Sequence, residues 1–160
     1  MGSYEKNWSR KRHDTKHFIE QKSGAFRCDH CRALVVINEF MGTLNRNHCN
    51  FCLWSKHVDI KKGDRQSACK AGMEPIGLTF KHEGLSRIGE LMLIHYCHGC
   101  GKLSINRIAA DDMVEEVYGV YYQSQELPET FIHQIRENGI YFATYTNKDE
   151  IDYQLIGKVK

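Results

Sequence analysis

The chain has 160 residues and a formal net charge of +2, a length that suits one domain or two small ones. It contains no run of 18 apolar residues, so no membrane-spanning helix is expected, and its polar first residues lack the apolar core of a secretory signal. We therefore expect a cytoplasmic protein, in which the seven cysteines stay as thiols unless a metal ion holds them.

Residues 1–25 are polar and basic. Apolar residues are few here and show no sustained period, which predicts a flexible basic arm rather than a core element. The arm is either a solubilising tail or a segment that forms a helix, around 8–20, on a partner. Its cations include Arg10, Lys11, Arg12 and Lys16.

Residues 26–110 contain all the cysteines and have the pattern of short β elements. Runs of β-branched and aromatic residues predict strands at 33–37, 76–81, 90–96 and 102–107, separated by turns that carry Gly, Asn and Asp. Each strand is too short to bury much apolar surface. We therefore expect this module to depend on metal for much of its stability.

Residues 111–160 contain no cysteine and change in character. Asp111 or Asp112 is placed to cap a first helix, whose apolar residues recur at helical spacing. A second helix is expected between Pro128, a good first-turn residue, and Gly139, a good residue to follow a helix.

The end of the chain completes the predicted architecture. Alternating apolar residues at 140–146 and 151–158 predict a β-hairpin. The fold class is thus α+β: a small zinc-ribbon-like β module followed by two short helices and a hairpin. The predicted parts are a basic arm at 1–25, a zinc module at 26–110 and an acidic extension at 111–160.

The most informative motif is a pair of cysteines separated by two residues, which occurs three times. The pairs are Cys28/Cys31, Cys49/Cys52 and Cys97/Cys100. Two thiolates spaced in this way reach one ion from a single turn, and two such turns complete a tetrahedral zinc shell. The spacing of the first two pairs is typical of one zinc site. A crossed pairing stays open, because closing the longer loop costs only about 0.8 kcal/mol more.

The remaining cysteines leave a second site one ligand short. Cys69, Cys97 and Cys100 supply three thiolates, and one histidine would complete a second shell, which gives two zinc ions and eight ligands. We favour His57, which follows the second pair closely enough to turn toward Cys69. The alternatives are His48, His95, Asp59 and a water molecule.

Charge is distributed unevenly along the chain. Residues 1–110 hold 18 Lys/Arg and 10 Asp/Glu, a balance of +8, whereas residues 111–160 hold 4 and 10, a balance of −6. Thiolate zinc shells remove part of the positive charge but not the polarity. The sequence therefore predicts a basic front and an acidic back.

Several longer motifs resemble the bacterial RNHCP-domain family, over about residues 23–112. They are Arg46-Asn47-His48-Cys49, Ser55-Lys56-His57-Val58-Asp59, Gly63-Asp64-Arg65, Ile94-His95-Tyr96-Cys97 and Asn106-Arg107-Ile108-Ala109-Ala110-Asp111-Asp112. Asn50 stands where the family name ends in Pro, and because Asn tolerates turn geometry we expect metal binding to persist. The resemblance implies a small zinc-binding module and names no substrate.

Cations and aromatic residues alternate around the second cysteine pair, which predicts a nucleic-acid surface. The candidate contacts beyond the arm are Arg46, Trp54, Lys56, Lys61, Lys62 and Arg65. Aromatic rings among cations suit stacking on unpaired bases, although we expect either Phe51 or Trp54 to pack beside the zinc instead. RNA is favoured over DNA because no predicted helix resembles a recognition helix. A ribosome-associated protein that acts in translation fits this pattern.

Other functions were weighed on the same residues. A protein–protein adaptor or a DNA-binding zinc-ribbon regulator would use the acidic residues 111–160 to meet its partner. We expect a monomer. We also expect no enzyme, because two closed zinc shells leave no open coordination position for a substrate. A metal-dependent nuclease is the alternative, and its carboxylates are interpreted as caps and turns: Asp59, Asp64, Asp111 and Asp112.

Overall fold

The structure is a computed structural model. It describes residues 24–37, 39–41, 46–61, 64–82 and 88–157. All but the last two residues of the predicted arm at 1–25 therefore lie outside the described part, and so do its cations and Lys62. In the part that is described, no helix is both long enough and apolar enough to cross a membrane.

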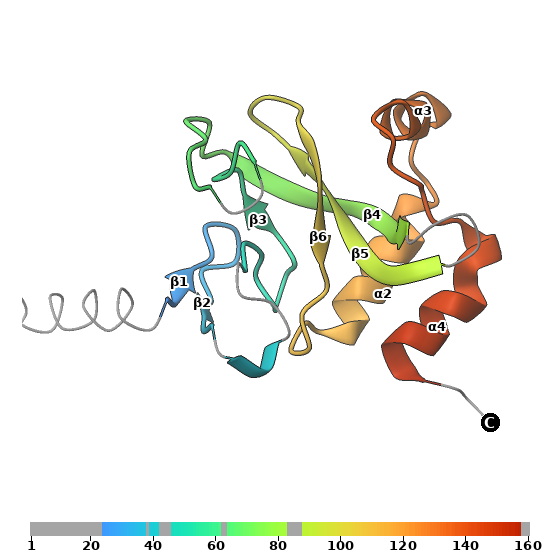
Figure 1. Cartoon of the computed structure of the whole chain (residues 1–160), viewed down its shortest axis with the longest axis horizontal. Helices are drawn as coiled ribbons and strands as arrows, with labels where there is room; N and C mark the ends of the chain where they lie inside the picture. Colours follow the sequence, from blue (N-terminus) through green and yellow to red (C-terminus); the bar gives the residue numbers. More distant parts are fainter. Residues whose placement is uncertain (1–23, 38, 42–45, 62–63, 83–87, 158–160) are drawn as a thin grey trace, which may run out of the picture.

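A four-stranded antiparallel sheet occupies the centre of the molecule (Figure 1). In sheet order the strands are β3 (Ser55–Lys56), β4 (Gly72–His82), β5 (Ile88–Cys97) and β6 (Leu103–Arg107). The long central pair places Met73 opposite Cys97 and Leu78 opposite Leu93. The strands predicted at 76–81, 90–96 and 102–107 are confirmed, since β-branched and aromatic residues favour a pleated, buried surface.

A second, two-stranded sheet carries the first cysteine pair. Strand β1 (Phe26–Arg27) pairs with β2 (Leu34–Val35), and the turn between them contains Cys28 and Cys31. A short 3₁₀ helix, η1 (Glu39–Met41), follows. Both lie at one end of the main sheet, away from the C-terminal helices (Figure 1).

Helix α2 (Val114–Ser124) covers the centre of the sheet. Its buried residues Val117 and Tyr121 join a core that contains Leu78 of β4 and, beside the second cysteine pair, Leu53. Ile151 of the last helix belongs to the same core. The core therefore continues across the boundary predicted at 110/111, and burial of these side chains stabilises both parts together.

Helix α3 (Glu129–Glu137) packs through Ile132 and Ile135 into a second core cluster with Phe142. The prediction of a helix between Pro128 and Gly139 is confirmed, with Pro128 as N-cap and Gly139 at a φ of 73°. That left-handed conformation favours glycine, which explains why the helix stops there.

The predicted β-hairpin at 140–158 is wrong. The segment instead forms the 3₁₀ turn η2 (Tyr145–Asn147) and helix α4 (Lys148–Ile156). Ile151 and Leu155 lie four residues apart, so a helix places both against the core, and Lys148 pairs with Asp152 at the same spacing. Asp149 and Glu150, which the sequence places in the turn of the expected hairpin, instead lie in the first turn of α4, where the helix dipole favours acidic side chains.

The cap predicted for the first helix is also wrong. Met113 occupies the N-cap position of α2, and no side chain caps the helix there. Asp111 and Asp112 face the second cysteine pair instead, where they bind Arg46. In class, the fold remains α+β as predicted, with two cysteine-rich clusters at one side of the sheet.

Candidate metal centres

The three Cys-x-x-Cys pairs adopt the same turn. In the first, the amide of Arg32 donates to the Cys28 carbonyl at 3.0 Å, and the Cys28 amide donates to the Ala33 carbonyl at 2.9 Å. Arg32, directly after the second cysteine, has a φ of 65°. This left-handed residue closes the turn, so that both sulfurs point to one side.

The second and third turns repeat these contacts one for one. Leu53 donates to the Cys49 carbonyl at 2.8 Å and has a φ of 61°. Gly101 donates to the Cys97 carbonyl at 2.9 Å and has a φ of 76°. Each first cysteine again donates its amide to the residue five positions later, at 2.9 Å. The local sequence thus builds three equivalent two-sulfur platforms.

A fourth platform has the same hydrogen bonds but contains an insertion. The His57 amide donates to the Ala71 carbonyl at 2.9 Å, and the Lys70 amide donates to the His57 carbonyl at 3.1 Å. Lys70, directly after Cys69, has a φ of 53°. His57 therefore stands where the first cysteine of a knuckle would stand, and Cys69 stands at the second. Residues 58–68 replace the usual two residues between them.

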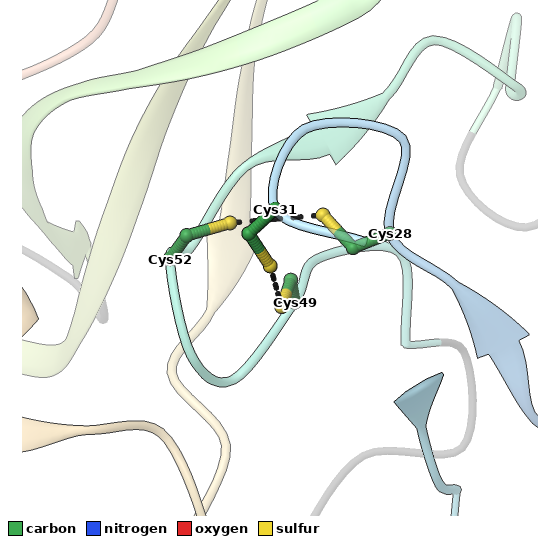
Figure 2. Close-up of side chains that lie close together, drawn as sticks. All are labelled: Cys28, Cys31, Cys49 and Cys52. Carbon is green, nitrogen blue, oxygen red and sulfur yellow. Dashed lines mark hydrogen bonds between the residues drawn. The ribbon is translucent and has the colours of Figure 1, made fainter. Parts of the chain in front are cut away.

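The first cluster joins two of these platforms. The turn between β1 and β2 supplies Cys28 and Cys31, and the turn before β3 supplies Cys49 and Cys52 (Figure 2). The Sγ atoms of Cys28 and Cys52 lie 3.6 Å apart, as do those of Cys31 and Cys49. All four sulfurs lie within 4.8 Å of one another.

The second cluster joins the third platform to the inserted one. Cys69 and Cys97 have their Sγ atoms 3.6 Å apart, and the Cys100 sulfur lies 3.3 Å from Nδ1 of His57. These four ligand atoms also lie within 4.8 Å of one another. The structure thus pairs the first Cys-x-x-Cys motif with the second, and the third with Cys69 and His57. It does not show the crossed pairing.

Both clusters have the dimensions of a zinc shell. With Zn–S bonds of about 2.3 Å, the edge between two sulfurs of a tetrahedron is about 3.8 Å, and an edge between sulfur and nitrogen is about 3.5 Å. The observed 3.6 and 3.3 Å are close to these edges. Four thiolates, or three thiolates and an imidazole, are the donors that structural zinc prefers, so the clusters fit two zinc sites.

Burial disfavours the charged thiolate form of some of these cysteines, and a bound cation would offset this cost. Burial raises the pKa of Cys49 to about 11, and burial likewise raises that of Cys52. Burial also opposes ionisation of Cys97, but the amides of Cys100 and Gly99 donate to its sulfur and lower its pKa to about 6. Zinc would hold all of these sulfurs as thiolates, because metal binding displaces their protons.

A family model, described as the RNHCP domain, matches residues 23–118, which is more than half of the chain. The chain belongs to the RNHCP domain family. No curated protein and no solved structure was found to match it. The match extends past the predicted module into α2, in agreement with the core that α2 shares with β4.

The two histidines that were alternatives for the eighth ligand, His48 and His95, make other contacts. His48 is buried and donates from Nε2 to Asp112 at 2.7 Å. His95 is buried with Nε2 2.7 Å from the Leu53 carbonyl and Nδ1 2.9 Å from the Asn106 amide. Burial lowers the pKa of His95 to about 3, so it remains neutral. Neither ring reaches a sulfur cluster.

Arg46, the first residue of the motif, is not a nucleic-acid contact, which corrects the prediction. Its side chain is 0% exposed and donates to Asp111 and, at 2.6 Å, to Asp112. It also donates to the His48 carbonyl at 2.8 Å. A guanidinium held in this way joins the second knuckle to the segment before α2 and cannot reach a phosphate in solvent.

Asn47 and Asn50 complete the motif. Asn47 donates from its side chain to Asp59 at 3.0 Å, which also accepts from the Arg65 amide, so Asp59 is occupied as a loop anchor rather than as a ligand. Asn50, in place of the family Pro, offers its carbonyl to the Met113 amide at 3.0 Å. The knuckle turn is intact around it. The sequence alone does not pair Arg46 with Asp111 and Asp112, because these lie 65 and 66 residues away.

The other predicted nucleic-acid residues lie on or near the knuckles. Lys56, Lys61 and Arg65 are exposed. Trp54 is half-buried and stacks on His30 with ring centroids 4.1 Å apart, so one of its faces is covered, whereas Phe51 is 46% exposed. The expectation that one of these two aromatic residues packs beside the zinc stays a prediction, and Trp54 is the less exposed of the two.

Proposed function

We propose that this RNHCP protein is a non-catalytic, cytoplasmic zinc protein that binds structured RNA on a ribosomal particle. Each cluster offers four protein ligands to its metal, and a closed shell of this kind serves structure rather than chemistry. The zinc sites would then hold knuckle loops rigidly in place, and those loops would meet the RNA.

The observation that carries the proposal is a group of exposed cations around the knuckles. They are Arg27, Arg32, Lys56, Lys61, Arg65 and Lys70. They come from β1, the knuckle turn that follows it, β3 and the segment between β3 and β4, at the end of the molecule opposite α3 and α4 (Figure 1). Cations that a rigid scaffold holds together attract a phosphate backbone without needing to be ordered on binding.

In addition to Asp29 and Asp59, which pair with Lys56 and Arg65, the described residues include a group of acidic side chains at the helical end of the molecule. Helices α2, α3 and α4 carry them, at Glu115, Glu116, Glu129, Glu137, Asp149, Glu150 and Asp152. Helices with this charge do not suit the DNA major groove, where a recognition helix would have to lie, whereas RNA can be met through the knuckle loops alone, which favours RNA over DNA. They could instead meet basic ribosomal proteins beside the RNA, and the chain itself would act as a monomer.

Co-sedimentation of zinc-loaded protein with purified ribosomes across a salt series tests the proposal. Binding should weaken steeply with salt, and replacing Arg10, Lys11 and Arg12 with Gln should lower the slope by about two to three. A matched control is Arg136→Gln on α3, which removes one exposed cation from the acidic end. Binding that is indifferent to salt and to the triple variant would contradict the proposal.

A protein–protein adaptor is the second candidate, favoured by exposed tyrosines at the acidic end. They are Tyr122 (48% exposed), Tyr141 (42%), Tyr145 (60%) and Tyr153 (53%). Tyrosine is enriched in protein interfaces because it combines apolar area with a polar tip. If Tyr122→Ser and Tyr145→Ser abolish association while the arm variant does not, the adaptor function is the better account.

A further inference from the structure

A pocket lies between the first knuckle and β3, on the side of the molecule that carries the exposed cations. Its volume is about 480 Å³, within the range of small-molecule sites. The turn of the β1–β2 hairpin forms one wall, and β3 with the inserted loop after His57 forms the other. Both walls contain or adjoin predicted zinc ligands, so metal binding would hold them in place.

One part of the pocket lining is aromatic. Phe26, His30 and Trp54 all contribute. His30 and Trp54 are stacked with an interplanar angle of 3°, and His30 is the exposed member of the pair. A flat, exposed ring at the edge of an existing stack is a surface on which a further planar ring can stack.

The other part of the lining is cationic. Arg27, Lys56 and Arg65 belong to it and are all exposed. Among the described lining residues Asp29 supplies the one carboxylate, and it pairs with Lys56 at 2.8 Å with both side chains about half exposed. Exposed pairs of this kind contribute little to stability, so an incoming anion could replace Asp29 as the partner of Lys56.

From this combination we infer that the pocket binds one unpaired nucleotide, with its base against the His30–Trp54 stack and its phosphate at Arg27, Lys56 and Arg65. The aromatic wall suits any base, whereas the cations select for the phosphate. The inference rests on the proposed RNA function for its biological source, but the chemistry of the pocket can be tested without RNA.

The direct test titrates zinc-loaded full-length protein with a mononucleotide, uridine 5′-monophosphate, and follows the Trp54 indole and His30 ring signals by NMR. Uridine and ribose 5-phosphate are run as separate arms. We expect saturable shifts at both rings, with the mononucleotide binding at least about fivefold tighter than either fragment. No shift at these rings, or equal affinity for ribose 5-phosphate, would overturn the inference.

Variants then separate stacking from charge. His30→Ala should weaken mononucleotide binding about fivefold or more, whereas His30→Phe, which retains a flat ring, should keep it. Lys56→Gln and Arg65→Gln should weaken the mononucleotide but not uridine, and Arg136→Gln should change neither. Zinc content and thermal melting should be unchanged in His30→Ala. If His30→Phe loses binding as severely as His30→Ala, stacking is not the contact.

Two RNAs separate this inference from the RNA proposal. One is a hairpin with an unpaired loop, and the other is a blunt duplex with the same number of phosphates. If the pocket reads an unpaired nucleotide, the hairpin binds tighter and His30→Ala removes the difference. Equal binding of both RNAs, unaffected by His30→Ala, contradicts the pocket inference and leaves the RNA proposal standing. Mononucleotide binding with no affinity for either RNA contradicts the RNA proposal and supports a free-nucleotide site.

Discussion

At the scale of single residues, Arg46 shows how a motif residue can be structural. Its guanidinium binds Asp111 and Asp112, and Asp112 also accepts hydrogen bonds from His48 and from the Ala109 amide at 2.8 Å. The Arg46 and Asp112 side chains are fully buried and that of His48 is 2% exposed, whereas the Asp111 side chain is 39% exposed. The network joins the second knuckle to the segment before α2, and the buried charges of Arg46 and Asp112 neutralise each other.

Removing Arg46 should therefore cost far more than removing a surface cation. Arg46→Met leaves Asp112 buried with its strongest partner gone, and we expect a loss of about 3 kcal/mol or more in the free energy of unfolding. Lys148→Met breaks the half-exposed pair with Asp152 and should cost about 1 kcal/mol or less. Urea unfolding of the zinc-loaded proteins measures both. Equal losses would contradict the network.

His57 should control the second metal. His57→Ala removes the nitrogen from a shell of three sulfurs, and we expect metal analysis to fall from two zinc ions per chain toward one. The exposed His98, which pairs with Glu74, is the matched control, and His98→Ala should retain two. Should His95→Ala lower the zinc content while His57→Ala does not, the assignment of the ligand would be wrong.

At the scale of elements, the third knuckle turn lies so close to the inserted platform that Gly99 has no room for a side chain. A Cβ added at Gly99 would lie 2.6 Å from the Ala71 Cβ and 2.9 Å from the Cys69 sulfur. The third platform can therefore approach the inserted one only because Gly99 has no side chain. The His57 and Lys70 hydrogen bonds close the inserted platform at its base.

Gly99→Ala should push Cys69 away and weaken the second zinc site alone. Zinc content should fall toward one ion, while the first cluster keeps its metal. Gly119 in α2 provides the control, because a Cβ there meets nothing within 4 Å. Gly119→Ala should keep both ions and stabilise the helix by up to about 1 kcal/mol. Full zinc content in Gly99→Ala would contradict the close approach.

At the scale of the whole molecule, we expect metal binding to be coupled to packing of the core. Leu53 follows Cys52 directly and is fully buried in the core that holds Val117 and Ile151. Loss of the first cluster would free Leu53 and open the core to α2 and α4. We therefore expect zinc to stabilise the C-terminal helices together with the knuckles.

Stepwise addition of a chelator should reveal this coupling. The second cluster should lose zinc first, because two of its four ligands, Cys69 and Cys100, are exposed, whereas Cys31 is the one exposed ligand of the first cluster. Loss of the first ion should then unfold α2 together with the knuckles. Zinc release and helix content, followed together by a metal indicator and circular dichroism, test the order. Helix content that survives removal of both ions would contradict the coupling.

The sequence by itself determined the features that depend on near neighbours. The spacing of Cys28/Cys31 and the two similar pairs dictates a tight turn with two sulfurs on one side, because the turn closes within five residues. The strands of the main sheet and the limits of α3 also followed from local pattern, since β-branched runs and the Pro128 and Gly139 boundaries act within one element.

Only the tertiary structure decided the features that join distant residues. It placed His57 rather than His48 or His95 at the second cluster, because the insertion after His57 brings Cys69 back beside it. It buried Arg46 against carboxylates 65 and 66 residues away, where composition had suggested a phosphate contact. It also made residues 148–156 helical. Their local pattern suits a strand or a helix, and the packing of Ile151 into the shared core favours the helix.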